Sequence, residues 1–171
     1  FTNSILCVTD GPRTQDQLFH DLLSLDAGSE ENLAFYPGWE TLPDEDSGPH
    51  PDIVGDRLAV LHAPSQPAAP NVTITTVQAI MQKTISLDRL RKDTLKLSLG
   101  DDTGPEKLTA SLSALGYRFQ VQISEKGEAA VRGCILDVWP LSEPWPLRLD
   151  FFGDSLESIR AFDPNTQRSI E

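Results

Sequence analysis

The order of apolar segments along the first 76 residues is the feature that most constrains the fold of this chain. Short apolar runs at residues 4–8, 32–36 and 72–75 have the length and composition of buried strands. Stretches in which apolar residues recur at helical spacing separate these runs from one another. Strands that alternate with helices usually pair in parallel, because each helix returns the chain to the end of the sheet at which the previous strand began. The sequence therefore predicts an α/β arrangement with a parallel sheet.

The two intervening helices carry start and stop signals. We expect Thr14 to begin the first helix, since Gln17 three residues later completes the pattern of a capping box. The second helix follows a loop at residues 37–51 and ends at Ala63 and Pro64. Apolar residues mark one face of each helix, namely Leu18, Leu22 and Leu25 on the first and Val54, Leu58 and Leu61 on the second.

The pattern changes after a charged stretch at residues 88–93. We place a domain boundary near Lys92, which divides the chain into residues 1–92 and 93–171. A short helix at residues 77–82 closes the first of these domains.

The second domain is predicted to be a small α+β domain. We expect a strand at residues 94–99, followed by a helix that Thr103 caps, with Glu106 at its third position and Gly116 just after its end. Four strand-like runs follow, at residues 117–123, 130–139, 147–152 and 156–162. These runs predict an antiparallel sheet with one covering helix.

Charge argues against a chain that binds nucleic acid by itself. The formal net charge is −12, and residues 1–50 hold one basic against ten acidic residues, whereas residues 91–171 hold ten against thirteen. Binding to a phosphate backbone draws much of its free energy from Lys and Arg, which are too few here. The nearly balanced second domain keeps its arginines available for another kind of partner.

Several kinds of site have no support in the sequence. Cys7 and Cys134 are far apart and form no zinc-ligand pattern, and no glycine-rich phosphate loop occurs among the eleven glycines. The acidic cluster at residues 44–46 near His50 fits a solvated linker better than a calcium loop, because glycine stands at positions where ligands are needed. We expect no metal, no bound cofactor and no catalytic residue in this chain.

The compartment and the start of the chain give two further expectations. No apolar run is long enough to span a membrane and no signal peptide is evident, so we expect a cytoplasmic protein without a membrane partner. The chain lacks an initial Met and enters an apolar run almost at once, as a piece of a longer protein would.

One candidate site survives this comparison. Side chains alternate along the strand at residues 147–152, so that Arg148, Asp150 and Phe152 lie opposite a set of three apolar residues. Arginine beside an exposed aromatic residue is typical of protein interfaces, and Arg132 with Gly133 offers a second arginine beside an open position. The pattern equally allows a structural role, in which the domain's own helix covers Phe152 and the arginines pair with Asp150 and Glu157.

Motifs along nearly the whole chain resemble the amino-terminal module of bacterial transcription-repair coupling factors. The first domain carries Phe-Tyr-Pro-Gly-Trp-Glu-Thr-Leu-Pro at residues 35–43, His-Pro-Asp-Ile at residues 50–53 and Thr-Val-Gln-Ala-Ile-Met-Gln at residues 76–82. The second carries Val-Arg-Gly at residues 131–133, Ile-Leu-Asp-Val-Trp-Pro at residues 135–140 and Leu-Arg-Leu-Asp-Phe-Phe-Gly-Asp at residues 147–154. This second group is similar to the segment that such factors share with the excision-repair protein UvrB.

The resemblance implies a RecA-like domain remnant, followed by a small domain that docks onto UvrA, the damage-recognition ATPase. It assigns UvrA contacts to Arg132, Arg148 and Phe152, with Gly133 and Asp150 as neighbours of lesser weight. The short loop at residues 37–51 leaves no room for the DNA-probing hairpin of UvrB.

The same resemblance implies that motor activity, with its ATP and magnesium, belongs to other regions of the parent protein. RNA polymerase and double-stranded DNA would also bind there. The alternative is a fragment of a UvrB-like, DNA-dependent ATPase or helicase subunit of the excision nuclease.

Overall fold

The computed structural model describes residues 4–25, 32–41, 48–63 and 70–170, and it divides into two compact units. Unit 1 is Phe1–Lys92 and unit 2 is Asp93–Glu171. Within the described ranges, no helix is both long and apolar enough to cross a membrane.

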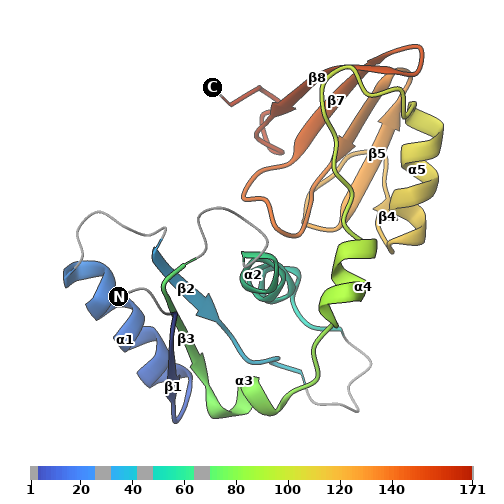
Figure 1. Cartoon of the computed structure of the whole chain (residues 1–171). Coiled ribbons are helices and arrows are strands. Elements are labelled where there is room, and N and C mark those ends of the chain that lie inside the picture. Colours follow the sequence, from blue (N-terminus) through green and yellow to red (C-terminus); the bar gives the residue numbers. More distant parts are fainter. Residues whose placement is uncertain (1–3, 26–31, 42–47, 64–69, 171) are drawn as a thin grey trace. The chain divides into compact units, whose positions relative to one another are not determined.

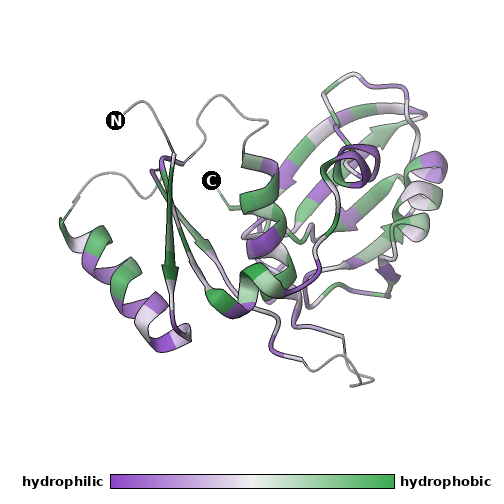
Figure 2. Ribbon diagram, turned by 60° about the horizontal axis from the view of Figure 1, so that its bottom comes forward, coloured by the Kyte–Doolittle hydropathy of each residue, from purple (hydrophilic) through white to green (hydrophobic). Residues whose placement is uncertain are grey.

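Unit 1 is built on a three-stranded parallel sheet, as the alternation of strands and helices predicts. The sheet order is β1-β3-β2, with β3 pairing with both neighbours. Helices α1 and α2 lie on opposite sides of this sheet, and α1 shows hydrophobic and hydrophilic residues in alternation along its length (Figures 1 and 2). The elements are β1 (Ile5–Thr9), α1 (Pro12–Leu25), β2 (Leu33–Tyr36), α2 (Pro51–His62), β3 (Val72–Thr76), α3 (Val77–Met81) and α4 (Leu87–Lys92).

The predicted capping box at Thr14 is wrong, because α1 already begins at Pro12. Proline suits a first helical position, where its missing N–H would have no partner within the helix. Gln15 in the same turn is buried, and its Nε2 donates to the carbonyls of Tyr36 and Ile74 at 3.0 Å each. The side chain of Gln15 thus ties the first turn of the helix to the sheet.

Arg57 stabilises the segment that leaves β2. Its guanidinium is sandwiched between the rings of Tyr36 and Trp39, at 4.3 and 4.1 Å from their centroids, and Nη1 donates to the carbonyl of Pro37 at 2.7 Å. The residue is 1% exposed, and this burial lowers the pKa of its guanidinium. The two aromatic faces and the Pro37 carbonyl therefore compensate a buried cation whose Nε and Nη2 have no hydrogen-bond partner among the described residues.

Unit 2 has one helix and a five-stranded mixed sheet of order β4-β5-β6-β7-β8. Strands β5 to β8 are antiparallel to their neighbours, but β4 pairs with β5 in parallel, so the prediction of an antiparallel sheet is wrong at this edge. The strand predicted at residues 117–123 is wrong beyond Phe119, because residues 120–127 fold back along the sheet, with Ile123 buried, so that β5 starts from the same end as β4. The elements are α5 (Pro105–Ala114), β4 (Arg118–Phe119), β5 (Glu128–Arg132), β6 (Ile135–Val138), β7 (Leu147–Phe152) and β8 (Ser155–Ala161).

Three local predictions for unit 2 also differ from the structure. Residues 94–99 form no strand, because this segment reaches β8 through backbone bonds only at Gly100 and Asp101, each with Leu156. The run at residues 130–139 is not one strand but a hairpin, which turns at Gly133 with a φ of 62°.

The N-cap of α5 is the third difference. Gly104 and not Thr103 occupies it, with a φ of 67°. A Cβ at this position would lie 2.5 Å from Oδ1 of Asp154, so the Asp154 side chain would have to move, and the positive φ by itself favours glycine.

The core of unit 2 lies between α5 and one face of the sheet. Leu108 and Leu112 of α5 pack there against apolar residues of β5 to β8. A smaller cluster of Ile123, Ala130 and Phe162 fills part of the opposite face. Because each fully buried large apolar side chain contributes about 1.5–3 kcal/mol, the first cluster supplies most of the stability of this unit.

Candidate functional site

Strand β7 presents different side chains on its two faces, as the alternation predicts. Leu149 and Phe151 are buried in the core at 1% and 5% exposure, whereas Phe152 is 81% exposed. The helix α5 packs against the core face, so it does not cover Phe152, and that part of the structural interpretation is wrong. We call the opposite side of the sheet the outer face, and define it by Arg132, Gly133, Arg148, Asp150 and Phe152.

Arg148 makes a two-pronged ion pair across the sheet with Asp137 of β6. Its Nε donates to Oδ1 at 2.7 Å and its Nη2 to Oδ2 at 2.9 Å, in the register that places these residues directly opposite each other. The hydrogen bonds to Asp137 raise the pKa of Arg148, although burial acts in the other direction. The structural interpretation supposed that Arg148 pairs with Asp150 or Glu157. Its hydrogen-bonded partner is instead Asp137.

Two further groups hold the same guanidinium. It lies over the ring of Phe162 at 4.3 Å from the centroid, and Nη2 also donates to Oε1 of Gln167 at 2.9 Å. Gln167 has a φ of 61°, in the left-handed region that residues other than glycine rarely adopt. Its own Nε2 donates to the carbonyl of Pro164 at 2.7 Å, so the turn after β8 is fixed beneath Arg148.

Arg132 is held more loosely than Arg148. Its side chain is 45% exposed, and its Nη2 lies 3.5 Å from Oδ2 of the same Asp137. Next to it, a Cβ built on Gly133 would have no heavy atom within 4 Å. The tip of the β5–β6 hairpin therefore leaves open space beside an accessible guanidinium.

The charge of Asp150 is compensated within unit 2. Ser158 donates to its Oδ2 at 2.6 Å, and Arg160 forms a short ion pair with the same oxygen. The Ser158 hydroxyl is the main cause of the lowered pKa of Asp150, which burial opposes and Arg160 supports. Asp150 thus has little attraction left for an external cation.

Comparison with known proteins identifies the family of this chain. Residues 95–171 match the family model described as the UvrB interaction domain. The chain is 36% identical over 169 residues to the transcription-repair-coupling factor of Haemophilus influenzae and 32% identical over 171 residues to that of Myxococcus xanthus, matches that cover 99% and 98% of its length. The Escherichia coli factor is 37% identical over 134 residues, or 78% of the chain. The chain belongs to the transcription-repair-coupling factor family.

The chain spans only a small part of the length of these relatives. The match spans 14% of the length of the Haemophilus influenzae and Myxococcus xanthus factors and 12% of the Escherichia coli factor. The family model covers α5 and all five strands of unit 2, and therefore the whole outer face.

Sequence reasoning missed the buried centre of the outer face. Asp137 is 1% exposed and contacts both arginines, yet it was not among the candidates. Its signal was present, because a lone carboxylate inside the apolar run at residues 135–138 must find a cation or hydrogen-bond donors. Gln167 and Phe162 had no comparable signal, since their contact with Arg148 depends on the turn after β8.

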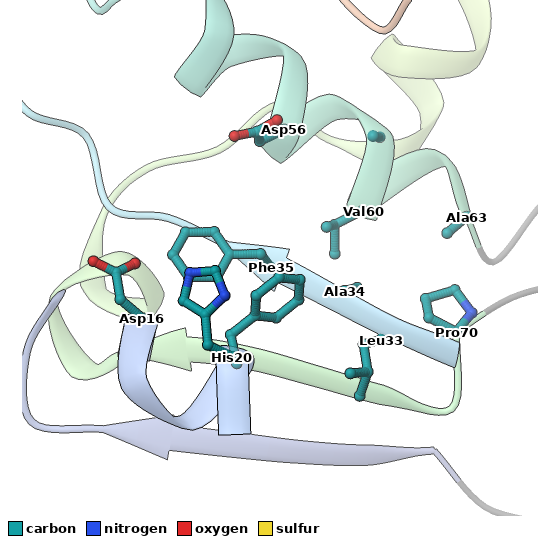
Figure 3. Close-up of a pocket in the computed structure, with 11 residues that line it drawn as sticks. Asp16, His20, Leu33, Ala34, Phe35, Asp56, Val60, Ala63 and Pro70 are labelled. Atoms are coloured by element: carbon teal, nitrogen blue, oxygen red, sulfur yellow. The ribbon is translucent and has the colours of Figure 1, made fainter. Parts of the chain in front are cut away.

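A cavity of about 540 Å³ in unit 1 contains none of the outer-face residues. It lies beside β2, where Asp16 and His20 of α1 and Asp56 and Val60 of α2 line it together with Phe35 (Figure 3). In the part of the chain that the structure describes, no three His, Cys, Asp or Glu side chains gather as metal ligands would. The acidic cluster at residues 44–46 lies outside the described residues.

Proposed function

We propose that unit 2 binds UvrA, and that this segment recruits nucleotide excision repair to stalled transcription as part of a longer coupling factor. The observation that carries the proposal is the 81% exposed ring of Phe152, on a sheet face that also carries Arg132 and Arg148, in the domain that matches the UvrB interaction model. An exposed aromatic residue of this size, on a strand whose other face is core, favours a partner that covers it.

Each group on the outer face has a distinct part in such an interface. Phe152 supplies apolar area for a hydrophobic recess on UvrA, and removal of a central aromatic anchor typically weakens binding by about 2 kcal/mol or more. Arg132 supplies an accessible guanidinium, while the open space at Gly133 lets a partner approach the hairpin tip. Arg148 lies on the same face, where its guanidinium covers the ring of Phe162.

Unit 1 supports the same proposal as a scaffold. A parallel sheet with helices on both sides is compatible with a RecA-like remnant, and the sequence contains no phosphate-binding loop. We propose that ATP and magnesium, RNA polymerase and double-stranded DNA bind other regions of the factor, and that this segment has no catalytic activity and works in the cytoplasm. The relatives found are coupling factors, which favours this function over a UvrB-like ATPase subunit.

Titration calorimetry of the 171-residue chain with purified UvrA tests the proposal. We expect saturable binding that Phe152→Ala and Arg132→Ala each weaken at least about tenfold. Met81→Ala is the matched control for Phe152, because Met81 is likewise 81% exposed but belongs to α3 of unit 1. Arg91→Ala in unit 1 is the control for Arg132. Absence of binding, or equal affinity of all four variants, would refute the proposal.

A further inference from the structure

Asp137 lies at the centre of the outer face and is inaccessible to any partner. It is 1% exposed, on the middle strand of the three that carry the face, with Ala130 of β5 on one side and Arg148 of β7 on the other. A buried carboxylate destabilises a fold unless cations or hydrogen-bond donors compensate it. Both compensating cations are arginines that belong to the proposed UvrA interface.

The charges around Asp137 do not balance. One carboxylate is shared by the guanidiniums of Arg132 and Arg148, which leaves one positive charge uncompensated. Asp150 also attracts Arg148, but its carboxylate is paired with Arg160, so that among the described residues of this cluster three guanidiniums face two carboxylates. A surplus cation on the same sheet face as an exposed aromatic ring is suited to an acidic group on a partner.

The hydrogen bonds of Arg148 show which edge it has left to offer. Its Nε and both donors of Nη2 are used by Asp137 and Gln167 at 2.7–2.9 Å. Among the described residues, Nη1 has only a 3.5 Å contact with the carbonyl of Gln167. Arg148 can therefore present Nη1 to a partner, while Arg132 has a 45% exposed side chain and a single ion pair of 3.5 Å, with Asp137.

We propose that Asp137, with Gln167, is a positioning residue that holds Arg132 and Arg148 side by side, so that a single carboxylate of UvrA binds the positive charge left over. The proposal rests on the proposed function, because it concerns the same interface with UvrA. It assigns to Asp137 a role in binding although the residue itself touches no partner.

Asp137→Asn separates positioning from simple charge compensation. The substitution keeps the shape of the side chain but removes an anion beside the interface, so charge alone predicts equal or tighter binding to an acidic partner. Positioning predicts the opposite, because Arg148 loses its charge-assisted fork and Arg132 loses the group that orients it. We expect an unchanged or faster association rate and a dissociation rate that rises about tenfold.

Glu128→Gln provides the matched control. Glu128 is also a buried carboxylate of unit 2, at 4% exposure, and it pairs with Arg118 and the backbone of Ser124 at the other end of β5. Loss of either carboxylate lowers the stability of the unit, but only Asp137→Asn is expected to change UvrA binding. Equal rate constants for Asp137→Asn and wild type, or tighter binding by the variant, would overturn the proposal.

Gln167→Gly tests the same role without loss of stability. It removes the Oε1 acceptor from Arg148 but relieves the strained φ of 61°. We expect an equal or higher melting temperature together with about threefold weaker UvrA binding. Unchanged affinity would contradict the positioning role even if Asp137→Asn failed to fold.

The salt dependence of the binding affinity tests whether a carboxylate of UvrA pairs with this positive charge. Wild-type affinity should fall as ionic strength rises, and Arg132→Gln should lose more of this dependence than Arg91→Gln does. Equal salt dependence of the two variants would exclude an ionic partner at Arg132. If the wild-type chain does not bind UvrA at all, the proposed function fails, whereas wild-type binding with unaffected Asp137→Asn and Gln167→Gly overturns only the positioning role.

Discussion

Phe151 and Phe152 are adjacent in β7 and lie on opposite faces of the sheet, the first 5% and the second 81% exposed. One ring fills the core between the sheet and α5, and the other has no cover within unit 2. Two neighbouring phenylalanines thus have different roles: Phe151 stabilises the core, and Phe152 is available to a partner.

Alanine at each of these positions should therefore have different effects. Phe151→Ala should lower the free energy of unfolding of unit 2 by about 3–5 kcal/mol, because it opens a cavity in the core. Phe152→Ala should change it by less than about 0.5 kcal/mol, because the ring is already in water. Urea unfolding followed by circular dichroism measures both values. A large loss of stability in Phe152→Ala would mean that its ring is buried in the fold.

Arg57→Ala should destabilise unit 1 by about 3 kcal/mol. The substitution removes a buried side chain that stacks between Tyr36 and Trp39 and leaves the carbonyl of Pro37 without its donor. Arg91→Ala serves as the control, because Arg91 has a 68% exposed side chain and only a 4.0 Å ion pair with Asp88. Thermal unfolding monitored by tryptophan fluorescence reports on this region through Trp39. Equal melting temperatures for the two variants would contradict the role of Arg57.

Unit 2 should lose stability in acid. Burial opposes ionisation of Glu128, but the N–H groups of Ser124 and Glu125, at 2.8 and 3.1 Å, more than offset it and lower its pKa. A carboxyl with a lowered folded-state pKa stabilises the fold above its unfolded pKa, and this contribution is lost as the pH falls through the folded-state value. Denaturant unfolding between pH 7 and pH 2.5 should show a decline below about pH 4.5. The decline should be shallower in Glu128→Gln, and an identical profile would contradict the assignment.

Gly104→Ala should destabilise unit 2 by about 1–3 kcal/mol. Alanine would be strained at the positive φ of 67°, and its Cβ would also lie too close to the Asp154 carboxylate. Gly116→Ala is the matched control, since its φ is 90° but no heavy atom lies within 4 Å of the added Cβ. Chemical unfolding of both variants separates backbone strain from the clash. Equal losses in the two variants would show that Asp154 moves away without effect.

Periodicity in the sequence was sufficient to predict the parallel sheet of unit 1 and the two faces of β7. Both depend on local patterns, namely the alternation of strands with helices and the period of two along a strand. The parallel pairing of β4 with β5 depends on contacts between distant segments, and so does the absence of the strand predicted at residues 94–99. Local patterns do not carry that information.

The difference between local patterns and distant contacts also explains why the sequence predicted the position of Arg148 but not that of Arg57. Arg57 lies in a helix whose apolar stripe at Val54, Leu58 and Leu61 is only half-buried, while Arg57 itself is inaccessible. Its aromatic partners come from the segment that follows β2, so helical periodicity alone points to the wrong face. Arg148 was found by alternation, but its partner Asp137 follows only from the cross-strand register.

Hydrogen–deuterium exchange of the 171-residue chain, with and without UvrA, tests the central claim most directly. We expect UvrA to slow exchange in peptides that cover the β5–β6 hairpin and the end of β7, around Arg132, Gly133 and Phe152. Peptides of unit 1 that line the cavity beside β2 should exchange at the same rate in both samples. Protection confined to unit 1, or no protection anywhere in the chain, would contradict the assignment of the outer face as the UvrA-binding surface.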